Sequence, residues 1–283
     1  MRVLVTGSHG LLGTSIVEVF AAQGHDVRPL DHGSLDIVDA RAVRDCVARV
    51  TPDVIINCAA YNDVDAAEDN AVSALQVNAL GVRGLAAAAR DVDAVFVHYS
   101  TDFVFDGTAT RPYIEEDAPS PQSVYGASKL LGEWFAADVR RHYVLRVESL
   151  FGPPAAGRPT RRGSLGTIVD RIRAGGPVPV FVDRTVSPSF TPDVARATAR
   201  LLDIAAPAGL YHCVNDGAAT WLEVAKEVAG VLGRDLQAAP LTLETVRARA
   251  VRPRFCALSP ARLASLGVVM PTWQDALVRY LQA

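Results

Sequence analysis

The sequence contains little that would direct the chain to a membrane or to nucleic acid. No apolar run reaches the roughly 20 residues that a membrane-spanning helix needs. Residues 1–7 (MRVLVTG) reach a glycine before the apolar segment of a signal peptide can form. The 28 Lys and Arg against 31 Asp and Glu give a formal net charge of -3, so no basic field is available for nucleic acid or anionic lipid. We therefore expect a cytoplasmic protein that binds neither.

Clusters of metal-ligating or disulfide-forming residues are also lacking. The four cysteines are widely separated and form no CxxC pair: Cys46, Cys58, Cys213 and Cys256. This spacing argues against both a disulfide framework and a structural zinc site. The six histidines are scattered singly, so we predict no metal site.

Residues 1–150 instead show short apolar segments that alternate with amphipathic helical patterns. Strands are expected at 2–6, 26–30, 53–57, 94–99 and 143–147, and helices at 11–23, 40–50, 66–90 and 123–141. Strands that are apolar throughout, such as 54–56 (VII), are typical of a parallel sheet covered on both faces. The pattern predicts an α/β fold with a Rossmann-type doubly wound parallel sheet.

The rhythm changes after about residue 150. Residues 152–163 are dense in Pro, Gly and Arg and predict a loop. Later helix starts are marked by Thr191 as an N-cap before a proline, by a capping box from Thr220, and by Thr272. We predict an NAD(P)-binding domain at 1–150. A smaller α/β domain at 151–283 would bind mainly substrate and return segments to the first.

A glycine loop connects the first strand to the first helix. In the segment 6–13 (TGSHGLLG), Gly7 permits a tight turn, Gly10 lets backbone approach a pyrophosphate, and Gly13 permits close helix–strand packing. His9 lies inside this loop, where it can contact a cofactor. Three glycines in this register predict dinucleotide binding rather than a simple turn.

Asp31 ends the second strand, 18 residues beyond Gly13. A carboxylate there can accept hydrogen bonds from the adenosine ribose and would repel a 2′-phosphate, which favours NAD. His32 and Arg28 could accommodate the phosphate of NADP. Asp36 could reach the adenine amino group or cap a helix. We expect NADH to be usable and preferred.

Tyr125 and Lys129 place a phenol and an ammonium four residues apart, on one face of the expected helix. We expect the nearby cation to lower the pKa of Tyr125, so that the phenol can protonate a carbonyl oxygen during reduction. Ser100 and Thr101 lie at the carboxyl end of the fourth strand, where open α/β sheets bind ligands. With the glycine loop, these residues form the short-chain dehydrogenase/reductase pattern.

Longer motifs extend this pattern. They are 57–61 (NCAAY), 64–68 (VDAAE), 99–107 (YSTDFVFDG), 125–133 (YGASKLLGE), 187–195 (SPSFTPDVA) and 209–212 (GLYH). With them the chain resembles the dTDP-4-dehydrorhamnose reductase family of extended short-chain reductases. The resemblance implies a two-domain enzyme that reduces the 4-keto group of a nucleotide-linked deoxysugar with NAD(P)H. It also implies a homodimer as one arrangement of the subunits.

The resemblance assigns roles by position. Thr101, Tyr125 and Lys129 would be the catalytic group. The cofactor would be lined by Gly7, His9, Gly10, Leu11, Leu12, Asp31, Asp36, Ile37, Ala59, Ala60, Tyr61, Asn78, Ser100, Tyr125 and Lys129. The substrate would be bound by Val64, Thr101, Asp102, Phe103, Arg184 and Arg252.

Three departures bear on the substrate. Where the family commonly has RxSWVYG, residues 146–152 read RVESLFG, so Ser149 replaces a stacking Trp. Ser15 stands where some bacterial members have a glutamate that binds a dimer-bridging magnesium, so we expect no such bridge. The segment usually written RPxNS reads RPRFC at 252–256.

Arginines of the second half are candidates for the substrate diphosphate, because guanidinium groups pair with phosphate in a bidentate manner. They are Arg161, Arg162, Arg184 and Arg252. Two alternatives to the reductase remain open at this point. One is an epimerase or dehydratase that retains its NAD. The other is a cofactor-binding regulatory subunit similar to the beta subunit of methionine adenosyltransferase.

Overall fold

A six-stranded, fully parallel sheet forms the centre of the molecule. The computed structural model describes residues 1–153 and 163–282. The strand order is β10-β5-β4-β3-β1-β2. The strands are β1 (Arg2–Thr6), β2 (Asp26–Leu30), β3 (Val54–Asn57), β4 (Val95–Thr101), β5 (His142–Val147) and β10 (Gly209–His212). The order reverses between β1 and β3, as in a doubly wound sheet, which confirms the predicted fold class.

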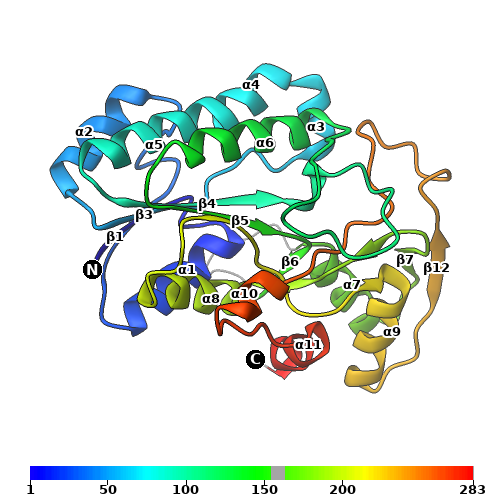
Figure 1. The fold of residues 1–283 in the computed structure, drawn as a ribbon. Helices are drawn as coiled ribbons and strands as arrows, with labels where there is room; N and C mark the ends of the chain where they lie inside the picture. Colours follow the sequence, from blue (N-terminus) through cyan, green and yellow to red (C-terminus); the bar gives the residue numbers. More distant parts are fainter. Residues whose placement is uncertain (154–162, 283) are drawn as a thin grey trace.

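Helices cover both faces of the sheet (Figure 1). One face packs against α2 (Ala40–Val50), α5 (Val82–Asp91) and α6 (Val124–Ala137), and the other against α1 (Leu11–Ala22) and α8 (Thr191–Asp203). Successive strand residues point to opposite faces, so Leu4 enters the first core while Val3 and Val5 enter the second. Both cores are apolar, which explains strands without alternation.

The helix expected at 66–90 is interrupted. It divides into α3 (Val64–Asp69), α4 (Ala71–Leu75), the π-helical segment η1 (Gln76–Gly81) and α5. Asn70 ends α3, and the wider turn of η1 directs the buried Asn78 side chain to the backbone of Tyr61. The π-helical segment therefore positions a loop at the carboxyl edge of the sheet.

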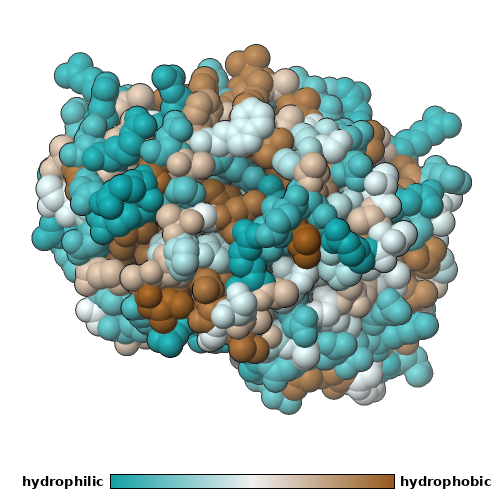
Figure 2. All heavy atoms as spheres, viewed as in Figure 1, coloured by the Kyte–Doolittle hydropathy of each residue, from teal (hydrophilic) through white to brown (hydrophobic). Residues whose placement is uncertain are grey.

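By length and composition alone, the stretch Ala71–Asp91 is long and apolar enough to cross a membrane. The expectation that no such run exists was therefore wrong. The inner residues of this stretch, Leu85, Ala86, Ala88 and Ala89, belong to the core beside the sheet. On the face seen in Figure 2, hydrophilic side chains predominate and apolar ones form small scattered patches.

The second half contributes both to this sheet and to a core of its own. Its β10 and α8 belong to the first sheet and its helical cover. A separate apolar cluster is built from α7 (Ser164–Arg173), β7 (Val178–Phe181), α9 (Trp221–Leu232) and α11 (Trp273–Gln282). The remaining elements are η2 (Asp102–Val104), β6 (Leu150–Phe151), β8 (Thr185–Val186), β9 (Ser189–Phe190), β11 (Ala219–Thr220), β12 (Ala238–Leu241) and α10 (Ala261–Ser265). The division at residue 150 into cofactor and substrate domains stays a prediction.

Helix starts in the second half match the sequence signals in two cases out of three. Thr220 and Glu223 form the predicted capping box, and the Thr272 hydroxyl accepts from the amide of Asp275. The prediction for Thr191 was wrong by one residue. Phe190 is the N-cap, Thr191 is the first helical residue, and the Thr191 hydroxyl contacts Ser15 from α1.

Candidate active site

A cavity of about 800 Å³ lies at the carboxyl edge of the sheet. Parallel strands end at the same edge, so the loops after β1, β3, β4 and β5 converge there. The second half closes the cavity with Arg184, Trp221 and Arg252. This volume is within the range of small-molecule sites.

The glycine loop forms one wall. Gly7 has φ +65, and a Cβ there would lie 2.5 Å from the Ala59 amide nitrogen. At Gly13 a Cβ would overlap the Gly7 carbonyl. Only glycine therefore lets the loop close against α1 and the end of β3. The first residues of α1, from Leu11 to Gly13, line the cavity. A helix N-terminus suits the phosphates of a dinucleotide.

Fifteen of the residues predicted for the site line this cavity. They are His9, Gly10, Leu11, Leu12, Ala59, Ala60, Val64, Ser100, Thr101, Asp102, Phe103, Tyr125, Lys129, Arg184 and Arg252. Six predicted cofactor residues do not belong to the lining: Gly7, Asp31, Asp36, Ile37, Tyr61 and Asn78.

Those residues have other contacts. Asp31 contacts His9, a residue that lines the cavity, with 2.7 Å between His9 Nδ1 and Asp31 Oδ2. The Asp36 carboxylate accepts from the amide of Val38 in the turn before α2, whose N-cap is Asp39, so the capping alternative for Asp36 was wrong. Ile37 is buried in the apolar core beside α5. Asn78 is fully buried and donates to the Tyr61 carbonyl, so it fixes the loop that carries Ala59 and Ala60.

The predicted catalytic group is brought together at one place. Thr101 is the last residue of β4, and Tyr125 and Lys129 come from the first two turns of α6. The Ser123 hydroxyl caps this helix and so fixes its start. Lys129 is 3% exposed and donates from Nζ to the Tyr99 carbonyl over 2.6 Å. Burial lowers the pKa of Lys129 to about 8, against the opposing charge of Glu133.

The expected lowering of the pKa of Tyr125 was wrong. Burial raises the pKa of this phenol, the charge of Asp102 raises it further, and only a hydrogen bond from Thr101 acts in the opposite direction. The Lys129 ammonium donates a hydrogen bond to the Tyr99 carbonyl. In this arrangement Tyr125 is a protonated phenol, and thus holds the proton that a carbonyl reduction needs.

A buried ion pair lies beneath the catalytic group. The Ser100 hydroxyl donates to Glu133 Oε1 over 2.5 Å, and Arg146 binds both oxygens of Glu133 at 2.9 and 2.8 Å. Glu133 is one helical turn beyond Lys129, so this carboxylate fixes the spacing between β4, β5 and α6. The Ser100 hydroxyl is thereby directed into the protein.

The two described arginines among the phosphate candidates already have partners. Arg252 forms a bidentate pair with Asp65 on α3, at 2.9 and 2.7 Å. The Arg252 hydrogen bond lowers the pKa of Asp65 to about 2. Arg184 donates to the Pro253 carbonyl and to Cys256 Sγ. Arg161 and Arg162 lie outside the described residues.

Sequence reasoning missed a charged cluster in the floor of the cavity. Asp102, Glu148 and Cys256 have ligand atoms within 4.8 Å of one another and are all buried. Among the residues that the structure describes, this is the one group that could hold a metal ion. Arg184 donates to Cys256 Sγ and places a positive charge near Asp102 and Glu148. Two members of the cluster, Glu148 and Cys256, lie in the segments that depart from the family pattern.

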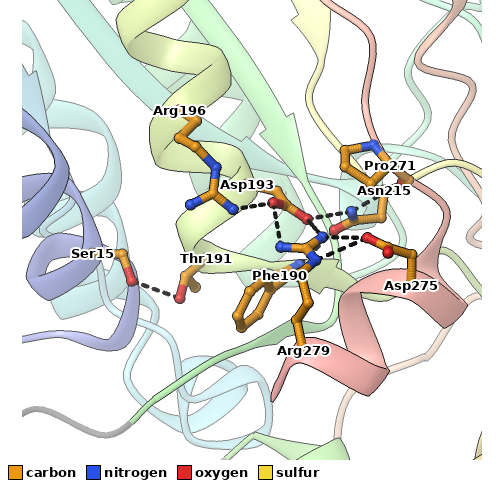
Figure 3. Close-up of polar contacts among 9 residues, drawn as sticks. All are labelled: Ser15, Phe190, Thr191, Asp193, Arg196, Asn215, Pro271, Asp275 and Arg279. Carbon is orange, nitrogen blue, oxygen red and sulfur yellow. Dashed lines mark hydrogen bonds and ion pairs between the residues drawn. The ribbon is translucent and has the colours of Figure 1, made fainter. Parts of the chain in front are cut away.

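The position of the family's magnesium ligand is occupied by a different contact. Ser15 Oγ and Thr191 Oγ1 are 2.8 Å apart (Figure 3). Nearby, the Asp193 carboxylate accepts from Arg279 and Asn215, and Asp275 also pairs with Arg279. These contacts fasten the C-terminal helix α11 to α8. The absence of a metal bridge stays a prediction.

Comparison with known proteins agrees with this geometry. The family model for the RmlD substrate binding domain matches residues 1–283. The chain belongs to this family. It is 37% identical over 291 residues to a dTDP-4-dehydrorhamnose reductase of Streptomyces griseus, covering 100% of this chain and 93% of that protein.

Two solved structures of family members have the same fold. A dTDP-4-dehydrorhamnose reductase of Bacillus anthracis in complex with NADP has a TM-score of 0.92 and 31% identity, covering 99% of this chain and 98% of the other. One from Clostridium acetobutylicum has a TM-score of 0.91 and 32% identity, covering 100% and 99%. The resemblance inferred from the motifs is confirmed.

Proposed function

We propose that this RmlD-family chain is an NAD(P)H-dependent reductase of the 4-keto group of a nucleotide-diphospho-deoxysugar. The observation that carries the proposal is the convergence of Thr101, Tyr125 and Lys129 on the cavity that the glycine loop opens. The names of relatives with 30% identity or more, dTDP-4-dehydrorhamnose reductase and a probable 4-ketoreductase, support it.

The residues present fit a nicotinamide dinucleotide. Gly10, Leu11 and Leu12 offer backbone to the pyrophosphate, while Ala59 and Ala60 leave room for the adenosine side. When bound, the reduced nicotinamide supplies the hydride. Lys129 would hold the nicotinamide ribose.

The chain itself supplies the proton and the orientation. Tyr125 would give its phenolic proton to the carbonyl oxygen as negative charge develops there. Thr101 would hydrogen-bond the same oxygen and orient it. Because both residues are at most 9% exposed, few water molecules compete for these hydrogen bonds.

The sugar and the nucleotide would be recognised from the second half. Ser149 lines the cavity where the family pattern has a Trp, and Trp221 on α9 reaches the same cavity. Trp221 is 5% exposed and belongs to the second apolar core, and Phe103 and Tyr125 also line the cavity. We expect the sugar ring to lie differently in this cavity than in members with the RxSWVYG segment.

Two finer expectations accompany the activity. We expect the enzyme to work in the cytoplasm and to associate as a homodimer, which light scattering at micromolar concentration would measure. The parallel sheet is buried on both faces and gives no reason to expect a membrane or nucleic acid as partner.

The proposed function is tested with a panel of nucleotide-diphospho-4-ketosugars. Loss of NADH or NADPH absorbance with at least one of them is the expected result. Protein that is purified with tightly bound NAD, and that interconverts sugars without net oxidation, would instead be an epimerase or dehydratase. No NAD(P)H oxidation with any ketosugar, together with co-purification of another enzyme, would favour the regulatory subunit.

A further inference from the structure

A row of three buried polar side chains crosses the central sheet at its carboxyl edge. The strand register pairs Thr6 with Asn57 and Asn57 with His98, so the three lie side by side on β1, β3 and β4. Each is at most 1% exposed. The residues two positions earlier on the same strands are apolar: Leu4, Ile55 and Phe96. Polar groups buried in such surroundings must hydrogen-bond to one another.

The direction of these hydrogen bonds fixes the Asn57 amide. The Ala59 amide donates to Asn57 Oδ1 over 3.1 Å, and the Thr6 hydroxyl donates to the same oxygen over 2.7 Å. A backbone N–H cannot accept, so Asn57 must present its oxygen to Ala59. The NH₂ group of Asn57 therefore faces His98, with 3.1 Å between Asn57 Nδ2 and His98 Nδ1.

The same reasoning fixes the tautomer of His98. The Asn57 NH₂ group can only donate, so His98 Nδ1 must accept and carries no proton. The ring is then neutral with its proton on Nε2, because a charged imidazole has a proton on both nitrogens. Burial and the charge of Lys129 lower the pKa of His98 well below its ordinary value, which agrees with a neutral ring. Among the described residues, His98 Nε2 has no hydrogen-bond partner, so Asn57 alone sets the tautomer.

Asn57 holds the start of a loop that lines the cavity. The Ala59 amide lies where this loop meets the glycine loop, since a Cβ at Gly7 would be 2.5 Å from the Ala59 nitrogen. Asn57 and Ala59 both line the cavity. At the end of the same loop, the Asn78 side chain binds the amide and the carbonyl of Tyr61. Two buried side-chain amides therefore hold this loop, one at each end.

We propose that His98 is a positioning residue for the cofactor, whose unprotonated Nδ1 keeps the Asn57 oxygen on the Ala59 amide beside the glycine loop. His98 does not line the cavity and acts through Asn57. An imidazole that presented an N–H to Asn57 would place two donors face to face. The Asn57 amide would then have to turn, and the Ala59 amide would lose this acceptor. The inference rests on the proposed function only in its need for NAD(P)H, and it is tested without any sugar.

Asparagine and leucine substitutions of His98 give the sharpest comparison. Both side chains branch at Cγ, but the asparagine oxygen can replace Nδ1 as an acceptor, whereas a leucine methyl group cannot. His98→Leu should raise the Kd for NAD(P)H about tenfold, because an unpaired buried donor lowers the population of the loop that binds. His98→Asn should keep nearly the wild-type Kd. His212→Leu, which removes another fully buried imidazole at the carboxyl edge of the sheet, is the matched control and should leave the Kd unchanged.

NMR of protein labelled with nitrogen-15 in its histidines reports the tautomer without any ligand. Wild-type His98 should carry its proton on Nε2 and none on Nδ1, unchanged between about pH 5 and 8. Loss of the signal in H98N identifies it. A proton on His98 Nδ1 in wild type would overturn the proposal, whether or not H98L folds.

Three binding results would also overturn it. They are a wild-type Kd in H98L, an equal increase in H98N and H98L, and an equal increase in H98L and H212L. Fluorescence titration of the purified variants with NADH and NADPH measures each Kd. If wild type reduced no ketosugar, the proposed function would fail while the binding and NMR results still decided the role of His98.

Discussion

His9 and Asp31 face each other across the entrance of the glycine loop, with 2.7 Å between His9 Nδ1 and Asp31 Oδ2. The other carboxylate oxygen of Asp31 accepts from both the amide and the hydroxyl of Ser34. The carboxylate is thereby held at the end of β2, where the ribose of an adenine dinucleotide is expected. We expect this carboxylate to disfavour a 2′-phosphate.

Replacing Asp31 with asparagine should strengthen NADPH binding and leave NADH binding less affected. Removal of one repelling charge is expected to lower the Kd for NADPH about tenfold, or about 1.4 kcal/mol. Fluorescence titration with each cofactor measures both constants. Asp26→Asn, at the opposite end of β2, is the matched control. An unchanged Kd for NADPH in D31N, or a wild-type kcat/KM for NADPH more than about tenfold above that for NADH, would contradict the preference.

Lys129 should make the stability of the protein depend on alkaline pH. Its pKa of about 8 in the folded protein lies below the ordinary value of 10.5, so the unfolded chain binds more protons between these two pH values. The free energy of unfolding should therefore rise as pH increases from 8 to 10.5. Lys129→Met should reduce this rise, as measured by urea denaturation.

The sequence provides a matched control, because Lys226 is its one other lysine and is exposed on α9. Lys226→Met should keep the wild-type dependence of stability on pH. Equal slopes in wild type and K129M would show that Lys129 has an ordinary pKa in the folded protein.

Arg252 should act on the nucleotide sugar rather than on the cofactor. Arg252→Ala is expected to raise the KM for the nucleotide sugar about tenfold or more, the effect of a lost charged hydrogen bond, with little change for NAD(P)H. Asp65→Asn releases the guanidinium from its bidentate partner and should leave KM unchanged or lower it. Equal increases in R252A and D65N would mean that the pair serves only to hold α3.

Chelation should have no effect on this activity. Arginines are proposed to bind the diphosphate, and Ser15 stands where a bridging magnesium would need a glutamate. Loss of activity in EDTA with recovery in magnesium would assign that role to a metal.

Local signals were sufficient for the strand–loop–helix units. Strand β2 and helix α2 have the predicted bounds, because each is delimited by residues near in sequence, such as the Asp39 N-cap of α2. The interruption of 66–90 was not predicted, since it depends on Asn78 meeting Tyr61 from another loop. The contact of the Thr191 hydroxyl with Ser15 was likewise not predicted, because the two residues are 176 apart in the sequence.

The site was predictable where chemistry follows from motif position and not where it depends on long-range contacts. Thr101, Tyr125 and Lys129 meet as expected because β4 and α6 pack side by side. The cluster of Asp102, Glu148, Arg184 and Cys256 joins four separate segments, and no sequence spacing predicts it. The pKa of Tyr125 was misjudged because the spacing to Lys129 does not reveal the burial of the phenol or the nearby charge of Asp102, which both raise this pKa.

The most direct measurement of the central claim is NAD(P)H oxidation by wild type and Tyr125→Phe with the best nucleotide-4-ketosugar of the panel. The phenol is proposed to be the proton donor, whereas the glycine loop and Lys129 hold the dinucleotide. Y125F should therefore bind NAD(P)H with nearly the wild-type Kd and lose about 10²–10⁴-fold in turnover. Retention of half the wild-type turnover by Y125F would contradict the assignment of Tyr125 and with it the mechanism.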